Sequence, residues 1–129
     1  MRMNVQHEIG VASQIGKYGD AVEVSAAEKW LFTSGTPGLA IDGTLPDEVS
    51  AQAELAWRHI VTMLERAEMT VDDLVKITQY LTRESDIAAY AQVRSRFLGN
   101  ARPASMLMIV PALVRPGFLV EVEVVAAKT

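Results

Sequence analysis

The sequence predicts an α+β fold in which two helices cover one face of a mixed sheet, in the order β-β-α-β-α-β-β. Two long segments carry apolar residues at three- and four-residue spacing, which is typical of amphipathic helices. Shorter segments alternate between polar and apolar residues, or are continuously apolar, as strands are. Strand pairs on either side of the helices indicate two helices packed on one sheet.

Size and composition limit the classes of protein that need to be considered. A chain of 129 residues suits a single domain, spanning 1–129, with one core. The absence of cysteine excludes disulfides, thiol catalysis and thiolate metal sites. The net charge of −4 opposes binding to nucleic acid. With no signal-like start and no apolar run of about 20 residues, we expect a cytoplasmic protein that does not enter a membrane.

The first half of the chain contains two predicted strands and one helix. Strand-like runs cover 21–24 and 30–34, and a tight turn at Asp42-Gly43 follows them. A helix is predicted from position 46 or 47 to 67. One apolar stripe along it comprises Val49, Ala53, Ala56, Trp57, Ile60 and Leu64.

The second half of the chain alternates again between strands and a helix. A strand is predicted over 75–82, and Ser85 is expected to cap a helix that ends at Gly99. The stripe of this helix comprises Ile87, Tyr90, Val93 and Phe97. The continuous apolar run 106–110 predicts a buried strand.

The last strand, predicted over 119–125, follows a turn at 115–117. Its alternation places Glu121 and Glu123 on one face. The last strands carry apolar residues on both sides, so we expect another subunit to cover the second face of the sheet.

Four segments in the same order resemble the YjgF/RidA family, which also carries the name endoribonuclease L-PSP. They are IGKYGDAV, WLFTSGTPGL, TVDDLVKITQYLT and FLVEVEVVA, and the resemblance extends from about position 15 to 126. The resemblance implies a chorismate-mutase-like fold, assembled as a homotrimer with clefts between subunits. It also implies hydrolysis of enamines and imines to a keto acid and ammonia, with no metal or organic cofactor.

The resemblance assigns the chemistry to Glu121, which matches the catalytic glutamate of the family. Tyr18 matches the tyrosine of the cleft, where its phenol would orient water or substrate. The residues alone favour a different interpretation, in which Glu121 and Glu123 are two solvated acids on one strand face. Tyr18 is equally a tyrosine that buries its ring at an interface.

Further residues are expected to line the cleft and bind the substrate. Ser34 and Gly35 would do so through backbone groups, although the same pair also fits an ordinary turn at a strand end. Tyr80, Ser105 and Met106 complete the expected binding residues. No metal ligands are expected, and methionines 63, 69, 106 and 108 are attributed to core packing.

The arginine with which the family binds a substrate carboxylate is missing. Counting fifteen positions back from Glu121 leads to Met106. Arg83, Arg102 and Arg115 are candidates for a relocated cation, although each also fits a solvated loop charge. The chain departs from the family pattern at Gly19-Asp20 and Thr36-Pro37 as well.

Three functions follow from these observations. One is a deaminase-type hydrolase that uses Glu121 and water on a small imine or enamine. A second is a non-catalytic trimer that binds a small molecule, which the replacement by Met106 favours. A ribonuclease is the third and ranks last, because His7 is expected in a mobile N-terminus and His59 within a helix.

Overall fold

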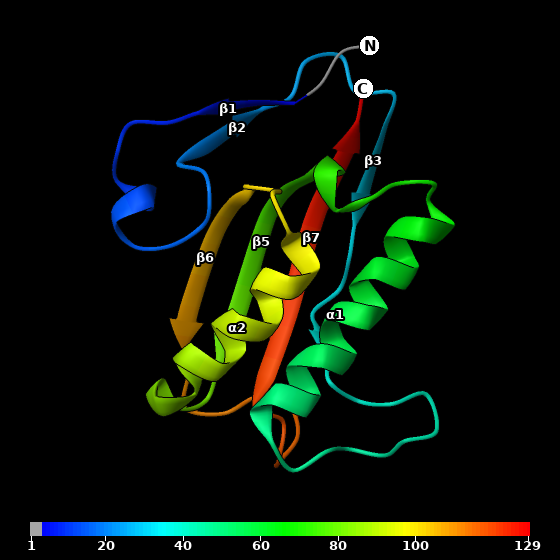
Figure 1. Ribbon diagram of the computed structural model, residues 1–129. Coiled ribbons are helices and arrows are strands. Elements are labelled where there is room, and N and C mark those ends of the chain that lie inside the picture. Colours follow the sequence, from blue (N-terminus) through cyan, green and yellow to red (C-terminus); the bar gives the residue numbers. More distant parts are fainter. Residues whose placement is uncertain (1–3) are drawn as a thin grey trace.

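A computed structural model describes residues 4–129 of the chain, and Figure 1 shows its helices and strands. The seven predicted elements are all present, together with short additional strands and 3₁₀ turns. The strands are β1 (Val5–His7), β2 (Ala21–Glu23), β3 (Lys29–Phe32), β4 (Thr36–Pro37), β5 (Leu74–Leu81), β6 (Ala104–Ile109) and β7 (Val120–Lys128). The helices are α1 (Val49–Arg66) and α2 (Ile87–Leu98), and the 3₁₀ turns are η1 (Ala12–Gln14), η2 (Val71–Asp73) and η3 (Glu84–Asp86).

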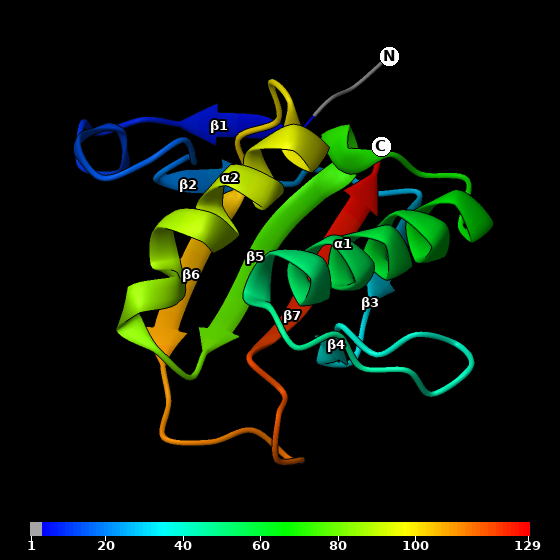
Figure 2. The same ribbon diagram turned by 60° about the horizontal axis from the view of Figure 1, so that its bottom comes forward.

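The main sheet has the strand order β3-β7-β5-β6, and β4 also pairs with β7. β5 and β6 are parallel, whereas every pairing to β7 is antiparallel. Both helices lie across the same face of this sheet (Figure 2). The predicted arrangement of two helices on one face of a mixed sheet is therefore confirmed, with the second face uncovered in the single chain.

Alternation along β7 and β5 determines which side chains enter the core. On β7, Val120, Val122 and Val124 are buried, and the residues between them are only partly buried. The predicted stripe of α1 packs against this face, with Trp57 and Ile60 fully buried. Apolar burial of this kind contributes about 25 cal/mol per Å² removed from water, so the core is the main source of stability.

A buried glutamine ties the start of α1 to two loops. The Nε2 group of Gln52 donates hydrogen bonds of 2.8 Å to the carbonyl oxygens of Pro46 and Gly117. Its Oε1 atom accepts a hydrogen bond of 2.8 Å from the backbone N–H of Leu119. Gly38, just after β4, lies against the backbone of this turn of α1, where a Cβ would overlap the Gln52 carbonyl oxygen and Cα.

The N-terminal segment differs from the prediction of a mobile N-terminus that contains His7. β1 pairs antiparallel with β2 in a separate two-stranded sheet, in which His7 lies opposite Ala21. The His7 ring also contacts the Glu23 carboxylate at 2.7 Å. β2 and β3 therefore do not form a hairpin with each other: β2 pairs with β1, and β3 pairs with β7.

The start of the second helix also differs from the prediction. Ser85 does not cap it: Ser85 lies inside η3, and α2 begins at Ile87 after Asp86. Asp86 makes no capping hydrogen bond, because its carboxylate accepts hydrogen bonds from Arg83 at 2.8 and 3.3 Å. The first helix is slightly shorter than predicted, with Glu48 at its N-cap position and Ala67 at its C-cap.

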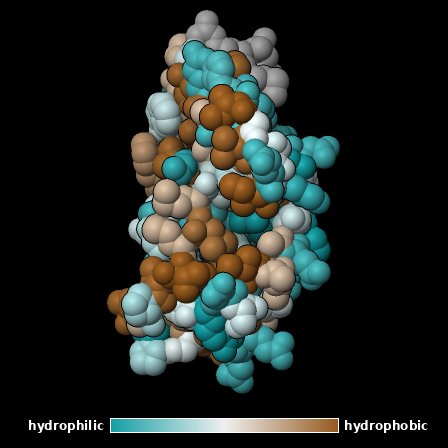
Figure 3. Space-filling model, turned by 90° about the vertical axis from the view of Figure 1, so that its left-hand side faces the viewer, coloured by the Kyte–Doolittle hydropathy of each residue, from teal (hydrophilic) through white to brown (hydrophobic). Residues whose placement is uncertain are grey.

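β6 is an edge strand and is not buried within the chain, contrary to the prediction for residues 106–110. Met106 is 48% exposed and Met108 is 36% exposed, so core packing is the wrong explanation for these two methionines. It is correct for Met69, which is buried. A continuous apolar run in a sequence does not show whether its side chains are covered by a helix of the same chain or by another molecule. In β6, α2 covers the side of Ser105 and Leu107 and leaves Met106 and Met108 exposed. Figure 3 views the side of the molecule on which β6 lies and shows patches of apolar side chains there.

Among residues 4–129, no helix is long and apolar enough to cross a membrane.

The close approach at Gly38 gives the first prediction. Gly38→Ala should lower the free energy of unfolding by about 3 kcal/mol, because the new methyl group meets helix backbone that cannot rotate away. Gly16→Ala is the matched control: its Cβ would lie 3.5 Å from the Tyr18 ring, so a change within about 0.5 kcal/mol is expected. Chemical denaturation at one protein concentration measures both. Equal stability of the two variants would contradict this account of the packing.

Candidate functional site

Glu121 lies on the uncovered face of the sheet, near the start of β7. Its register partners are Tyr80 on β5 and Pro37 on β4, and residues opposite one another in a sheet point to the same side. Glu121 is partly buried. Its carboxylate lies against Gly35, where a Cβ would come within 2.5 Å of Oε2. Three of the expected site residues, Gly35, Tyr80 and Glu121, are therefore brought together.

The backbone that follows β3 explains why Gly35 can pack there. Ser34 and Gly35 form the exposed connection into β4, and the Thr36 hydroxyl donates a 3.0 Å hydrogen bond to the Ser34 carbonyl oxygen. β4 then pairs with β7 through Thr36 and Pro37, which holds the connection next to Glu121. Glycine at this position leaves space for the carboxylate, and any larger residue would displace it.

Met106 also belongs to the uncovered face. It lies opposite Thr78 on β5, which in turn lies opposite Glu123 on β7. Met106 and Glu121 are therefore in adjacent rows of side chains, separated by the width of β5. The registers place Lys76 on this same face, one row beyond Thr78, and it is a cation that the sequence analysis did not consider.

The three arginines considered from the sequence have other partners. Arg83 forms an ion pair with Asp86 at 2.8 Å. The Arg115 guanidinium lies 5.8 Å from the centre of the Phe118 ring. Arg102 donates hydrogen bonds of 2.9 and 2.8 Å to the carbonyl oxygens of Gly99 and Ala101. Among the contacts of residues 4–129, none joins these arginines to Glu121.

Ser105 and Tyr18 lie elsewhere. Ser105 faces α2, and its hydroxyl accepts a 2.9 Å hydrogen bond from Gln79. Both residues line a groove of about 620 Å³ at the edge of β6. The groove is formed by residues 15–18 of the N-terminal loop, by Ile87, Ala91, Arg94 and Ser95 of α2, and by residues 105–107 of β6. The expected site residues thus form two groups, one on each side of the sheet, with Met106 lining the groove as well.

The buried amide of Gln79 joins α2 to β6 beside this groove. Its Nε2 group donates to the Ser105 hydroxyl and to the Met106 carbonyl oxygen, both at 2.9 Å. Its Oε1 atom accepts hydrogen bonds from the Tyr90 hydroxyl at 2.6 Å and from Arg94 at 2.9 Å. Every hydrogen-bonding position of the amide is therefore used.

Tyr90 is the neutral donor in this network. Burial raises the pKa of Tyr90, although the Trp57 indole, which donates a 3.3 Å hydrogen bond to its oxygen, and Arg94 act in the opposite direction. Because the phenol stays protonated, it donates to Gln79 throughout the ordinary pH range. The Arg94 guanidinium also lies 5.4 Å from the centre of the Tyr90 ring.

Arg94 is the groove residue that the sequence analysis missed. Two signals in the sequence point toward it. Gln79 is polar, yet it occupies an inward position of β5 between Ile77 and Leu81 and must have buried partners. Arg94 follows Tyr90 by four residues, so the two lie on one helix face directed at this glutamine.

The N-terminal loop is positioned by two residues at which the chain departs from the family pattern. The backbone N–H of Gly19 donates a 3.0 Å hydrogen bond to the Pro103 carbonyl oxygen. The Asp20 carboxylate accepts backbone hydrogen bonds from Ile9 and Ala12 at 2.8 Å and from Gly10 at 3.2 Å. These hydrogen bonds, that from Ile9 first, lower the pKa of Asp20.

The two histidines do not meet, which gives no support to ribonuclease chemistry. His7 is in the N-terminal sheet beside Glu23, whereas the Nε2 atom of His59 lies 2.7 Å from the Leu39 carbonyl oxygen. Among residues 4–129, no group of three histidine, aspartate or glutamate side chains is arranged to hold a metal ion.

Two helices on one face of a mixed sheet, with a carboxylate on the other face, define a class of small α+β proteins. A family model described as endoribonuclease L-PSP matches residues 10–128. The chain belongs to this family, the YjgF/RidA family, as its sequence motifs predicted.

Known relatives agree with this assignment. The chain is 29% identical over 118 residues to a RutC family protein of Pyrococcus abyssi, which covers 88% of both chains. It is 30% identical over 84 residues to TdcF of Escherichia coli, which is named provisionally as a reactive intermediate deaminase; the match covers 64% of this chain and 63% of TdcF.

Solved structures of the same fold include a Rid family protein of unknown function, YyfB of Yersinia pestis. Its TM-score is 0.82 at 24% identity, covering 98% of this chain and 97% of YyfB. RidA of an Antarctic Psychrobacter has a TM-score of 0.72 at 31% identity, covering 88% and 89% of the two chains.

The Asp20 contacts give a prediction about pH. Because the pKa of Asp20 is lower in the folded chain than in the unfolded one, its stabilising effect is present above the unfolded value near 3.8. It is lost as the pH falls through the lower folded value. Amide hydrogen exchange should show the protection of Ile9 and Ala12 decreasing in that acid range, and Asp20→Asn should decrease it already at neutral pH.

Asp42→Asn provides the control for this experiment. The pKa of Asp42 is also lowered, mainly by the backbone N–H of Thr44, but that contact lies in the turn before α1. Its substitution should affect Thr44 and leave Ile9 and Ala12 unchanged. Unchanged protection of Ile9 and Ala12 in Asp20→Asn would show that other contacts hold the loop.

Proposed function

We propose that this protein is a deaminase-type hydrolase that acts on a small imine or enamine. The observation that carries this proposal is the Glu121 carboxylate, partly buried on the uncovered face of the sheet and packed against the backbone of Gly35. It occupies the position of the glutamate that the family resemblance assigns to catalysis. The name of TdcF, a relative at 30% identity, supports the same class of reaction.

The proposed chemistry needs a proton acceptor and a water molecule. Glu121 takes a proton from water as the water oxygen bonds to the imine carbon, and it passes this proton to the imine nitrogen. The carboxylate then transfers the hydroxyl proton of the adduct to the nitrogen, and the C–N bond breaks, which releases ammonia and leaves a carbonyl group. Tyr80, opposite Glu121, offers a phenol to hold the water or a polar atom of the substrate.

The proposed working form is a homotrimer with the reactive clefts between subunits. The uncovered face carries exposed aromatic side chains at Trp30 and Phe32, whose rings stack with centroids 6.1 Å apart. Met106 and Met108 extend the apolar surface along β6. A surface of this kind on a small chain is typical of contacts between subunits.

A non-catalytic small-molecule binder is the second candidate. Met106 favours it, because a thioether on the face of Glu121 does not bind a carboxylate as an arginine does. In that case a ligand would raise the thermal stability of the protein and no product would form.

Substitution of the two glutamates of β7 tests the hydrolase. An amino-acid oxidase would generate 2-imino acids, and semicarbazide would trap the imine that survives in the presence of the protein. Glu121→Gln should reduce the acceleration of hydrolysis about 100-fold or more, since the amide cannot accept the proton. Glu123→Gln is the matched control and should retain the activity, because Glu123 lies one row away beside Thr78.

Gly35→Ala provides an independent variant for the same assay. Its Cβ would displace the flexible end of Glu121 and not backbone, so activity should fall while the melting temperature changes little. Full activity in both Glu121→Gln and Gly35→Ala would remove Glu121 from the mechanism. No acceleration by the unmodified protein with any imino acid would favour the binder.

The assembly is tested by substitution on the uncovered face. The unmodified protein should sediment with three times the chain mass of 14.1 kDa, and Phe32→Asp should lower that mass because a charge replaces a contact residue. Ile41→Asp, at an exposed apolar residue in the loop before α1, should leave the mass unchanged. A monomeric unmodified protein at micromolar concentration would contradict the trimer.

A further inference from the structure

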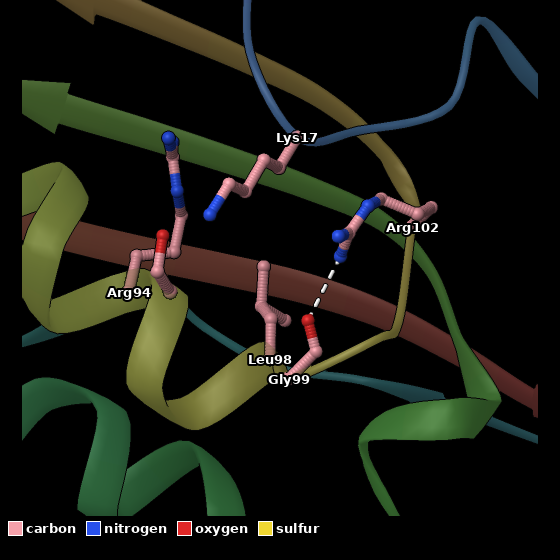
Figure 4. Close-up of a pocket in the computed structure, with 6 residues that line it drawn as sticks. Lys17, Arg94, Leu98, Gly99 and Arg102 are labelled. Carbon is pink, nitrogen blue, oxygen red and sulfur yellow. Dashed lines mark hydrogen bonds between the residues drawn. The ribbon is translucent and has the colours of Figure 1, made fainter. Parts of the chain in front are cut away.

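Three cationic side chains meet at the groove beside β6, one from the N-terminal loop and two from the segment that contains α2 and the approach to β6. Lys17 comes from the N-terminal loop, Arg94 from α2 and Arg102 from the segment before β6. All three line a small pocket of about 30 Å³, together with Ser95, Leu98 and Gly99. In Figure 4 the ammonium end of Lys17 lies between the guanidinium groups of the two arginines.

These cations lack acidic partners within the described part of the chain. The salt bridges among residues 4–129 involve other side chains, and no aspartate or glutamate lines either the pocket or the groove. Arg94 and Arg102 donate only to neutral oxygens, those of Gln79, Gly99 and Ala101. Like charges this close repel one another, so an anion placed among them would be stabilised.

The arginine that α2 contributes to this cluster is held in place before any ligand arrives. The Nη1 atom of Arg94 donates a 2.9 Å hydrogen bond to Oε1 of the buried Gln79, and the guanidinium lies over the ring of Tyr90. A side chain fixed in this way loses little conformational entropy on binding and keeps further N–H groups for an anion. Lys17 is carried by the loop that Gly19 and Asp20 fasten to the rest of the fold.

The groove next to the cations is apolar and large enough for a small organic molecule. The small pocket and the groove of about 620 Å³ share Lys17, Arg94 and Ser95, so they adjoin. Apolar residues line the remainder of the groove, namely Ile15, Ile87, Ala91, Leu107 and, at the edge of β6, Met106, whose side chain belongs to the uncovered face. An apolar cleft with a few convergent polar groups at one end is the usual form of a small-molecule site.

We propose that this groove binds a small organic anion, with its phosphate or carboxylate group among Lys17, Arg94 and Arg102 and its apolar part along β6. Ser95 lines the same pocket, and a serine hydroxyl can donate a hydrogen bond to an anion. The site is separate from the Glu121 carboxylate, since α2 covers one side of the sheet and Glu121 points from the other. It therefore does not depend on the hydrolase function proposed above.

Titration calorimetry with three matched probes tests the proposal on the full chain. Phenyl phosphate and phenylacetate supply the two anionic groups on one apolar ring, and benzyl alcohol is the neutral control. Both anions should bind saturably and at least tenfold more tightly than benzyl alcohol, and binding should weaken at high salt. The tighter of the two anions identifies the class of ligand, and a phosphate dianion is expected to be favoured by three cations.

Variants assign the binding to this cluster. Arg94→Gln and Lys17→Ala should each weaken the binding of phenyl phosphate about tenfold, the loss expected for one charge-assisted hydrogen bond. Arg94→Gln also removes the hydrogen bond to Gln79, whereas Lys17→Ala removes a charge without breaking any hydrogen bond within residues 4–129. Arg96→Gln, an exposed arginine of α2 outside the groove, is the matched control and should bind as the unmodified protein does.

Two further outcomes decide against the proposal. Absence of saturable binding by either anion would overturn it, as would equal affinity in the unmodified protein, Arg94→Gln and Lys17→Ala. Glu121→Gln should retain full anion affinity, and loss of binding in that variant would overturn the separation of the two sites. Failure of imine hydrolysis with intact anion binding would count against the proposed hydrolase alone.

Discussion

The buried amide of Gln79 is the interaction on which the arrangement around β6 depends. It lies on β5, and its four hydrogen bonds reach the Ser105 hydroxyl and Met106 backbone of β6 and the Tyr90 and Arg94 side chains of α2. An amide buried without partners would cost about 1–3 kcal/mol for each unsatisfied group, so the position of the helix relative to the edge strand is narrowly restricted. One of these four hydrogen bonds, that from Arg94, holds the arginine beside the groove.

The two faces of the main sheet provide different environments for side chains of the same strands. Toward the helices, alternate residues are apolar, and a polar network around Gln79 lies among them. Away from them, Glu121 and Tyr80 lie in one row and Met106 lies in the next, with the carboxylate pressed against Gly35. A change of one position in a strand moves a side chain from one environment to the other. Ser105 and Met106, neighbours in the sequence, accordingly face opposite ways.

Much of the fold follows from local patterns in the chain. The stripe that contains Trp57 predicted α1, and alternation around Ile77 predicted β5, because burial on one face imposes a period on the sequence. The pairing of β1 with β2 and the exposed edge at Met106 could not be predicted in this way. Both depend on which strands pair with each other, and the periodicity of one strand does not specify the strand with which it pairs.

The sequence by itself determined the family, the two helices, four of the five strands of the main sheet and the face on which Glu121 lies, because each is encoded by motif or by period within a short segment. Only the tertiary structure decided that Gly35 touches Glu121 and that Lys17, Arg94 and Arg102 converge. Gly35 and Glu121 are far apart in the chain, as is Lys17 from the two arginines. They meet because the parallel pairing of β5 with β6 and the docking of Gly19 on Pro103 bring the loop, the helix and the edge strand to one place.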